Sequence, residues 1–396
     1  MIDTLQSIFF TLYKKTPLTF KRYMHTRLDM SDRLIGIIGS RGVGKTTFIL
    51  QYLKMLDIPL EKKLYFAADH FEVARHSLYE IAEAFAQRGG EVLAIDEIHK
   101  YPGFERELKS IYDTFDLRVI FSGSSALQLE HAKADLSRRA VLYRIGGMSF
   151  REFIAYETGV ELEAYTLEEI LHDHVTISLE IAERIKPIAL FGEYLRYGYY
   201  PFYKSNKNLY LQKLTETINV VLESDLPLIF NIEPKNIFKL KKLLSLLCIS
   251  EPYELNISKL SAKIEINRNT LYHYLHYLEA GGLIMMIKQI TKGDGILTKP
   301  EKLYLANTNL THAYCDDHSR GTIREQFFAN QLGLAHRVHY ARQGDFLIDG
   351  KYLFEIGGKN KSFDQIRDLA DSFIAADDIE TGSGHKIPLW LFGFLY

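Results

Sequence analysis

The chain has 396 residues, of which 47% are hydrophobic, 25% are charged and only 10 are proline. This composition is typical of a folded protein and excludes an intrinsically disordered one, and the length is enough for two to four domains. A formal net charge of −2 argues against a protein held permanently on nucleic acid by overall positive charge, although local basic patches are compatible with it.

The sequence contains no membrane or secretory pattern. Its longest apolar runs, such as 388–396, are shorter than the roughly 18 residues that a membrane-spanning helix needs. The N-terminus carries Asp3 and lacks a long apolar region before a small-residue cleavage site. Cys248 and Cys315 are the only cysteines, too few for a disulfide framework. We therefore expect a cytoplasmic protein without membrane contact, in which both thiols stay reduced.

The first motif is a glycine-rich loop between an apolar run at 33–38 and a helix-forming stretch that begins near Thr46. Its pattern is Gly-x4-Gly-Lys-Thr, in which backbone N–H groups surround phosphate oxygens and the lysine reaches the β- and γ-phosphates. The threonine hydroxyl is a ligand for Mg²⁺. We expect ATP and Mg²⁺ to bind here, through Gly39, Ser40, Arg41, Gly42, Val43, Gly44, Lys45, Thr46 and Thr47.

A second apolar run, within 91–100, ends in Asp96 and Glu97, and Asp96 lies 51 residues after Lys45. Asp96 at the end of a strand suits a water-mediated contact to Mg²⁺, and Glu97 is placed to polarise an attacking water. The pair therefore predicts hydrolysis in addition to binding. A further predicted strand at 64–69 indicates the branch of P-loop proteins in which the acidic strand is not next to the P-loop strand.

The next predicted strand, 117–121, is followed by serines. Ser122 is expected between the γ-phosphate and the acidic pair, with Ser124 as the alternative, and a plain turn serine stays open for either. Arg138 and Arg139 precede a fifth predicted strand. An arginine presented across a subunit boundary can stabilise charge on the transferring phosphoryl group. Arg139 is the first choice for this role and Arg138 the second, while a surface arginine without a role stays open.

The middle of the chain is predicted to be helical over 151–235, and its aromatic cluster 197–203 is compatible with core packing or with a partner surface. Residues 257–284, with a tight turn at 265–267, predict a helix-turn-helix, and a hairpin turning at 293–295 would complete a winged helix. Contact with DNA and docking to a protein both remain open. The polar positions of the third helix and the wing lysines are Arg268, Asn269, Tyr272, His273, His276, Lys288, Lys292, Lys299 and Lys302.

From residue 321 the pattern is helix 321–333, three strands at 337–342, 344–349 and 351–356, helix 362–376 and strand 387–396. This αβββαβ order resembles the core of the PD-(D/E)xK nuclease superfamily. The resemblance implies a Mg²⁺ site at Glu325, Asp345 and Glu355. Gly357 stands where a lysine should share a face with Glu355, so Lys359 or Lys361 would have to swing back from beyond the strand end, with Lys359 as the first choice. A competent nuclease and a noncatalytic fold both stay open.

The segments IGSRGVGKTT, IDEIHKYPGFERELK, VIFSGSSAL, LSRRA and MSFREF, in this order, resemble bacterial and archaeal predicted ATPases of the AAA+ class with a C-terminal domain of unknown function. The resemblance implies an α/β fold with a parallel sheet of order 5-1-4-3-2, and it matches the catalytic arginine to Arg139. We expect an ATPase core at 1–150, a helical lid at 151–235, a winged helix at 236–300 and a nuclease-like domain at 301–396. The expected assembly is a homo-oligomer that binds DNA or a protein partner, with a monomeric switch as the alternative.

Overall fold

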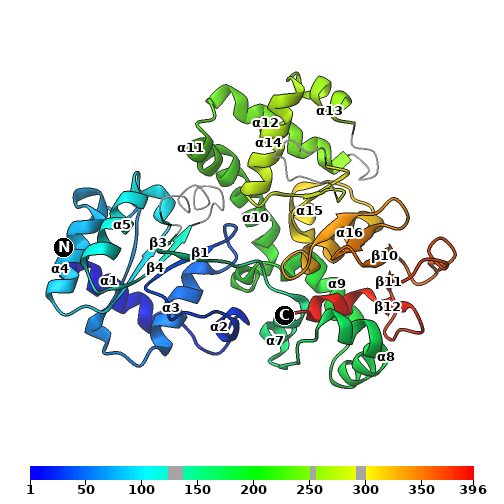
Figure 1. Ribbon diagram of the computed structural model, residues 1–396, viewed down its shortest axis with the longest axis horizontal. Helices are drawn as coiled ribbons and strands as arrows, with labels where there is room; N and C mark the ends of the chain where they lie inside the picture. Colours follow the sequence, from blue (N-terminus) through cyan, green and yellow to red (C-terminus); the bar gives the residue numbers. More distant parts are fainter. Residues whose placement is uncertain (124–135, 137, 250–255, 291–299) are drawn as a thin grey trace. The chain divides into compact units, whose positions relative to one another are not determined.

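The computed structural model describes residues 1–123, 136, 138–249, 256–290 and 300–396 (Figure 1). The chain divides into two compact units, Met1–Gly147 and Met148–Tyr396. The lid, winged helix and nuclease-like domains expected from the sequence all lie in the second unit, so their boundaries stay predictions. Ser124, Lys292, Lys299 and the expected hairpin turn at 293–295 lie outside the described residues.

The first unit contains a five-stranded sheet in which all neighbouring strands are parallel. Its order, β2-β3-β4-β1-β5, confirms the expected 5-1-4-3-2. Parallel neighbours need crossover connections, which is why helices separate the first four strands along the chain. The strands are β1 (Leu34–Ile38), β2 (Lys63–Ala67), β3 (Val92–Asp96), β4 (Arg118–Gly123) and β5 (Val141–Arg144).

Helices of the first unit cover this sheet with apolar side chains. Ile2 and Leu5 of α1, Phe85 of α4 and Leu108 of α5 join one buried cluster with residues of the strands. Ser77 begins α4 with a capping box, in which its hydroxyl accepts from the N–H of Glu80. The helices are α1 (Ile2–Lys15), α2 (Met24–Arg27), α3 (Lys45–Met55), α4 (Leu78–Gln87) and α5 (Phe104–Thr114), with 3-10 turns at Leu60–Lys62, Val73–Arg75 and Ile98–Lys100.

The second unit begins with a helical region, as predicted for 151–235. Tyr199, Tyr200 and Tyr203 are buried, so the aromatic cluster is largely core. Phe150 of α7 packs against Phe394 near the C-terminus, at 5.9 Å between ring centroids. The helices are α7 (Phe150–Thr158), α8 (Leu167–Arg184), α9 (Pro187–Glu193), α10 (Tyr210–Val220) and α11 (Leu226–Phe230), with π-helical turns at Tyr194–Gly198 and Val221–Asp225 and 3-10 turns at Pro201–Ser205 and Lys207–Leu209.

The expected helix-turn-helix elements follow in the expected order: α12 (Pro234–Ile249), α13 (Ile257–Ile264) and α14 (Arg268–Ala280). Glu265, in the left-handed region at φ 61°, ends α13, and the Asn267 side chain caps α14 by accepting from the N–H of Thr270. An antiparallel pair, β6 (Ile284–Ile287) and β7 (Lys302–Leu305), comes next. Whether these elements act as a winged helix stays a prediction.

The C-terminal part contains α15 (Thr308–Tyr314), α16 (Arg320–Leu332) and a mixed five-stranded sheet of order β12-β11-β10-β9-β8. The first three strands follow the prediction, and β11 and β12 continue the sheet in parallel to β10. The strands are β8 (Val338–Tyr340), β9 (Phe346–Ile348), β10 (Tyr352–Gly357), β11 (Ser372–Ala376) and β12 (Lys386–Pro388).

The helix predicted over 362–376 is wrong. Residues 363–371 form turns, and β11 takes the rest. The Ser372 hydroxyl donates to the carbonyls of Ile366 at 2.9 Å and Leu369 at 2.7 Å, which a continuing helix would need for its own N–H groups. The strand predicted over 387–396 is also wrong beyond Pro388, which lacks an N–H for the sheet. The chain there forms the buried 3-10 helix Leu389–Phe394.

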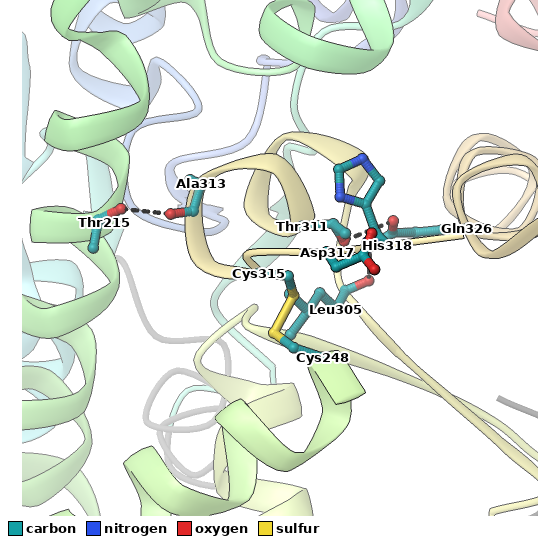
Figure 2. The surroundings of a disulfide bond; sticks show 9 residues. All are labelled: Thr215, Cys248, Leu305, Thr311, Ala313, Cys315, Asp317, His318 and Gln326. Atoms are coloured by element: carbon teal, nitrogen blue, oxygen red, sulfur yellow. Dashed lines mark hydrogen bonds between the residues drawn. A yellow bond between two sulfur atoms is a disulfide. The ribbon is translucent and has the colours of Figure 1, made fainter. Parts of the chain in front are cut away.

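The two cysteines are not the free thiols expected from the sequence. Cys248 of α12 and Cys315, which follows α15, form a disulfide with Cα atoms 5.3 Å apart (Figure 2). They are 67 residues apart in sequence, so only the packing of the two helices brings them together. Nearby, the Thr215 hydroxyl donates to the carbonyl of Ala313 at 2.8 Å, which ties α10 to α15 (Figure 2).

Within the described ranges, no helix has the length and apolar character needed to cross a membrane.

Candidate functional site

The P-loop connects β1 to α3 and depends on glycine at three places. Gly42 and Gly44 have φ angles of 86° and 97°, in the left-handed region that residues with a Cβ rarely adopt. At Gly39 a Cβ would lie 2.3 Å from the carbonyl oxygen of Ile145, so the loop and the segment after β5 approach too closely for a side chain. The glycine pattern seen in the sequence is thus a backbone requirement.

The lysine and threonine of the motif lie where α3 begins. Lys45 is 5% exposed, and its Nζ donates to the carbonyls of Gly39 at 2.9 Å and Ser40 at 3.0 Å. Thr46 and Thr47 are exposed in the first turn of the helix. The helix N-terminus, with its partial positive charge, therefore faces the loop that the lysine spans.

Asp96, at the end of β3, receives hydrogen bonds from three elements. The hydroxyls of Thr46 and Tyr65 donate to its Oδ2 at 2.5 and 2.8 Å, and the Ser122 hydroxyl donates to its Oδ1. Burial raises the pKa of Tyr65 far above its usual range, and the Asp96 carboxylate adds to this, so the phenol stays a donor. The sequence therefore placed Asp96 and Ser122 in one cluster with Thr46, but it missed Tyr65.

Glu97 follows in a strained backbone, with φ at 53°. Its N–H donates to the Asp96 carboxylate at 3.1 Å and to the Ser122 hydroxyl at 3.2 Å. Its Oε2 lies 3.7 Å from His99 Nε2 and 3.6 Å from Lys100 Nζ. Among the described residues, this buried oxygen has no hydrogen-bond donor. The strained turn therefore holds a carboxylate that can still accept a proton or a hydrogen bond.

These residues fit a nucleotide with Mg²⁺. Thr46 supplies a hydroxyl and Asp96 a carboxylate, the hard oxygen ligands that Mg²⁺ prefers, and they are already in hydrogen-bond contact. The exposed start of α3 and the Lys45 ammonium provide complementary charge for phosphates. Glu97 Oε2, which has no hydrogen-bond donor among the described residues, is the further feature that a catalytic water would satisfy.

Arg139, the first choice for the arginine that acts across a subunit boundary, is paired within its own chain. Arg139 forms a bidentate ion pair with Asp113 of α5, with nitrogen–oxygen distances of 2.9 and 3.0 Å, and its side chain is 28% exposed. Arg138 is exposed. Neither arginine is bonded to the Asp96 cluster, so their roles stay predictions.

Arg22 is a site residue that the sequence did not reveal. It is 5% exposed, and its guanidinium donates to the carbonyl of Val43 in the P-loop at 2.9 Å. The same group donates to the carbonyls of Gly146 at 3.1 Å and Gly147 at 2.8 Å. A fixed planar donor suits three converging carbonyls. Arg22 therefore joins the nucleotide loop to the last residues of the first unit.

The three carboxylates of the expected second metal site are all buried: Glu325 on α16, Asp345 before β9 and Glu355 in β10. Of the two candidate lysines, Lys361 rather than the first choice Lys359 forms the ion pair with Glu355, at 2.5 Å. A Cβ at Gly357 would lie 2.7 Å from the Lys361 stem, so the glycine leaves the room in which this stem folds back. Lys302, expected as a wing lysine, is 1% exposed and pairs with Glu325 and Asp345.

Two known protein families match separate segments of the chain. Residues 31–154, which contain the P-loop, Asp96, Glu97 and Ser122, match a family described as an AAA domain. Residues 188–320 match a family described as a domain of unknown function (DUF8612). The resemblance expected from the sequence is thus confirmed for an AAA domain with a domain of unknown function, whereas the winged helix and the nuclease-like domain stay predictions.

An uncharacterized protein of Methanocaldococcus jannaschii is 25% identical over 421 residues, covering 94% of this chain and 89% of that protein. The Walker-type ATPase PABY2304 of Pyrococcus abyssi shares 12% identity, with a TM-score of 0.42 over 76% of this chain and 99% of its own. AMPPCP-bound DnaA from Aquifex aeolicus shares 16% identity, with a TM-score of 0.27 over 69% and 88% of the two chains. The strand order and the P-loop geometry, rather than these superpositions, establish the fold.

Proposed function

We propose that the first unit hydrolyses ATP. The observation that carries this proposal is Glu97, whose buried Oε2 lacks a hydrogen-bond donor among the described residues while its backbone is tied to Asp96 and Ser122. A carboxylate held next to a P-loop and still able to accept a proton is suited to orient a water molecule. A protein that only binds nucleotide has no need for this feature.

Each residue of the cluster has a separate role in the proposal. Thr46 and Asp96 would hold Mg²⁺, which supplies polarisation of the terminal phosphate when it is bound. Lys45 places a fixed positive charge at the phosphates. Tyr65 and Ser122 donate to Asp96 and keep its carboxylate aimed at Thr46. Glu97 accepts a proton from the attacking water.

The test is Mg²⁺-dependent phosphate release by the full chain, compared between wild type and Asp96→Asn. The substitution keeps the shape of the side chain but removes the charge that Mg²⁺ needs, so turnover should fall by at least about 100-fold. Asp116→Asn, which changes a fully exposed carboxylate, should leave turnover unchanged. Wild-type turnover in Asp96→Asn, or no phosphate release by wild type, would reject the proposal.

We also propose a homo-oligomer in which Arg139 acts on a neighbouring subunit. Support comes from its position: it is bound to an exposed partner, Asp113, and not to its own P-loop. Sedimentation with ATP and Mg²⁺ tests this, because assembly is expected when nucleotide is bound. A sedimentation profile that stays monomeric would favour the alternative, a single-chain switch.

DNA binding by the second unit is the second candidate function. Exposed cations lie on α13 and at the start of α14, namely Lys259, Lys263 and Arg268, with Asn269 and His273 exposed beside them. Such side chains suit phosphate contacts from a helix-turn-helix. The basic hairpin expected from the sequence contributes less than expected, because Lys302 is buried.

A gel shift at several salt concentrations tests this function with Lys263→Glu combined with Arg268→Glu. Binding that weakens with salt and is lost in this variant supports DNA contact. Lys213→Glu on α10, an exposed lysine away from these helices, is the matched control. DNA binding that is unchanged in the double variant would reject α13 and α14 as the contact surface, and no binding by wild type would instead favour a protein as the partner.

A further inference from the structure

Lys302 is the first residue of β7 in the second unit, and its side chain pairs with two of the carboxylates expected to hold a metal. Its Nζ is 2.9 Å from Glu325 Oε2 and 2.9 Å from Asp345 Oδ1, and the side chain is 1% exposed. The same ammonium lies 4.9 Å from the centre of the Phe346 ring. One buried ammonium therefore contacts Glu325 of α16, Asp345 before β9 and Phe346 in β9.

Two further donors bond to oxygens of this cluster. The Tyr304 hydroxyl donates to Glu325 Oε2, and Asp345 Oδ2 accepts from the N–H of Ile356 at 2.8 Å. Glu355 is paired with Lys361 instead. Among the described residues, no group of three or more acidic, histidine or cysteine side chains is arranged to hold a metal ion. The residues therefore do not fit the metal that the resemblance implies.

Displacing Lys302 would be costly for the fold. The residue pairs with Ile287 in the β6–β7 ladder, so its backbone is fixed. A metal entering between Glu325 and Asp345 would have to drive a lysine ammonium out of a buried position, and breaking a buried ion pair on one side leaves uncompensated charge. The ammonium is consequently a part of the folded core and not a mobile counter-ion.

We propose that Lys302 is a built-in cation that takes the position of a divalent metal between Glu325 and Asp345, so that this part of the chain has no metal-dependent nuclease activity. The ion pairs instead join β7 to α16 and to the residue before β9. This inference does not depend on ATP hydrolysis. It makes the carboxylate cluster a structural centre of the second unit.

The single tryptophan, Trp390, allows a test in the full chain without nucleotide, because it is buried in the second unit and reports on that unit alone. Thermal unfolding is followed by its fluorescence, in EDTA and in Mn²⁺. The wild-type midpoint should be the same in both. Lys302→Ala should lower the midpoint by on the order of 10 °C, because two buried carboxylates lose their cation, and Mn²⁺ should recover part of that loss.

Two variants keep the test decisive. Lys359→Ala, at the exposed lysine that the sequence favoured, should melt like wild type. If Lys302→Ala does not fold, Lys302→Met combined with Glu325→Gln and Asp345→Asn should fold, because charge and not volume is the cause of the loss. The proposal is overturned if the wild-type midpoint rises in Mn²⁺ and this rise is lost in Asp345→Asn. It is also overturned if Lys302→Ala melts like wild type, or if folded Lys302→Ala is not stabilised by Mn²⁺. Failure of the neutral triple variant to fold would overturn it as well.

Discussion

Arg22→Ala removes a side chain that links the P-loop to the end of the first unit. Three hydrogen bonds from a charged donor are lost, to the carbonyls of Val43, Gly146 and Gly147. Hydrogen bonds to charged groups contribute about 1.5–3 kcal/mol each, and because such losses are not additive we expect the first unit to lose about 3–5 kcal/mol. Because the bond to Val43 holds the P-loop in place, we expect its loss to weaken ATP binding by roughly 10–100-fold.

The assay is titration of the full chain with a fluorescent ATP analogue, with unfolding of the whole chain followed by circular dichroism and that of the second unit by Trp390 fluorescence. Lys21→Ala, at the exposed neighbouring lysine, controls for the loss of a positive charge. Arg22→Ala should weaken nucleotide binding while the Trp390 signal of the second unit is unchanged. If the first unit loses stability but ATP binds as tightly as to wild type, Arg22 has only a structural role and the reasoning is refuted.

Two further predictions concern the second unit. Cys248→Ser removes a disulfide that closes a loop of 67 residues, so urea unfolding monitored at Trp390 should show a loss of about 4 kcal/mol, and reductant should produce the same loss in wild type but none in the variant. Burial lowers the pKa of His312 from 6.5 to about 4, with His318 and Arg196 contributing. The unfolded chain therefore binds more protons between pH 6.5 and pH 4, so stability should fall as the pH drops through this window, by about 1–2 kcal/mol because the partly exposed ring is screened by solvent. His312→Phe should flatten this dependence, and an equal slope in both proteins would contradict the assignment.

The nucleotide site was predictable because its pattern is local. Gly39 to Thr46 and Asp96-Glu97 are short motifs whose strand and helix context can be read from adjacent residues. Tyr65 had a weaker signal: Ala67 is aligned with Asp96 in the sheet, and residues two apart on a strand share a face. Arg22 had none, because its three acceptors come from two distant loops.

The second unit was less predictable because its decisive contacts are long-range. Lys302 is 43 residues from Asp345, and its place depends on where the β6–β7 pair packs. Lys361 reaches Glu355 because the chain turns after β10, where the N–H of Lys361 bonds to the carbonyl of Gly358, and this turn was expected to lead into a helix. The apolar pattern of 362–376 predicts a helix, but it does not register the hydroxyl of Ser372, which donates to two carbonyls that a helix would need.

The most direct test of ATP hydrolysis by the first unit is to measure ATP binding and phosphate release on the same sample of Glu97→Gln. The substitution keeps the P-loop, Lys45 and the Asp96 cluster but replaces the carboxylate whose Oε2 has no donor among the described residues. We predict wild-type affinity for ATP with turnover reduced by about 100-fold or more, as expected when a general base is removed. Turnover close to that of wild type would contradict the account, and so would a loss of ATP binding equal to the loss of turnover.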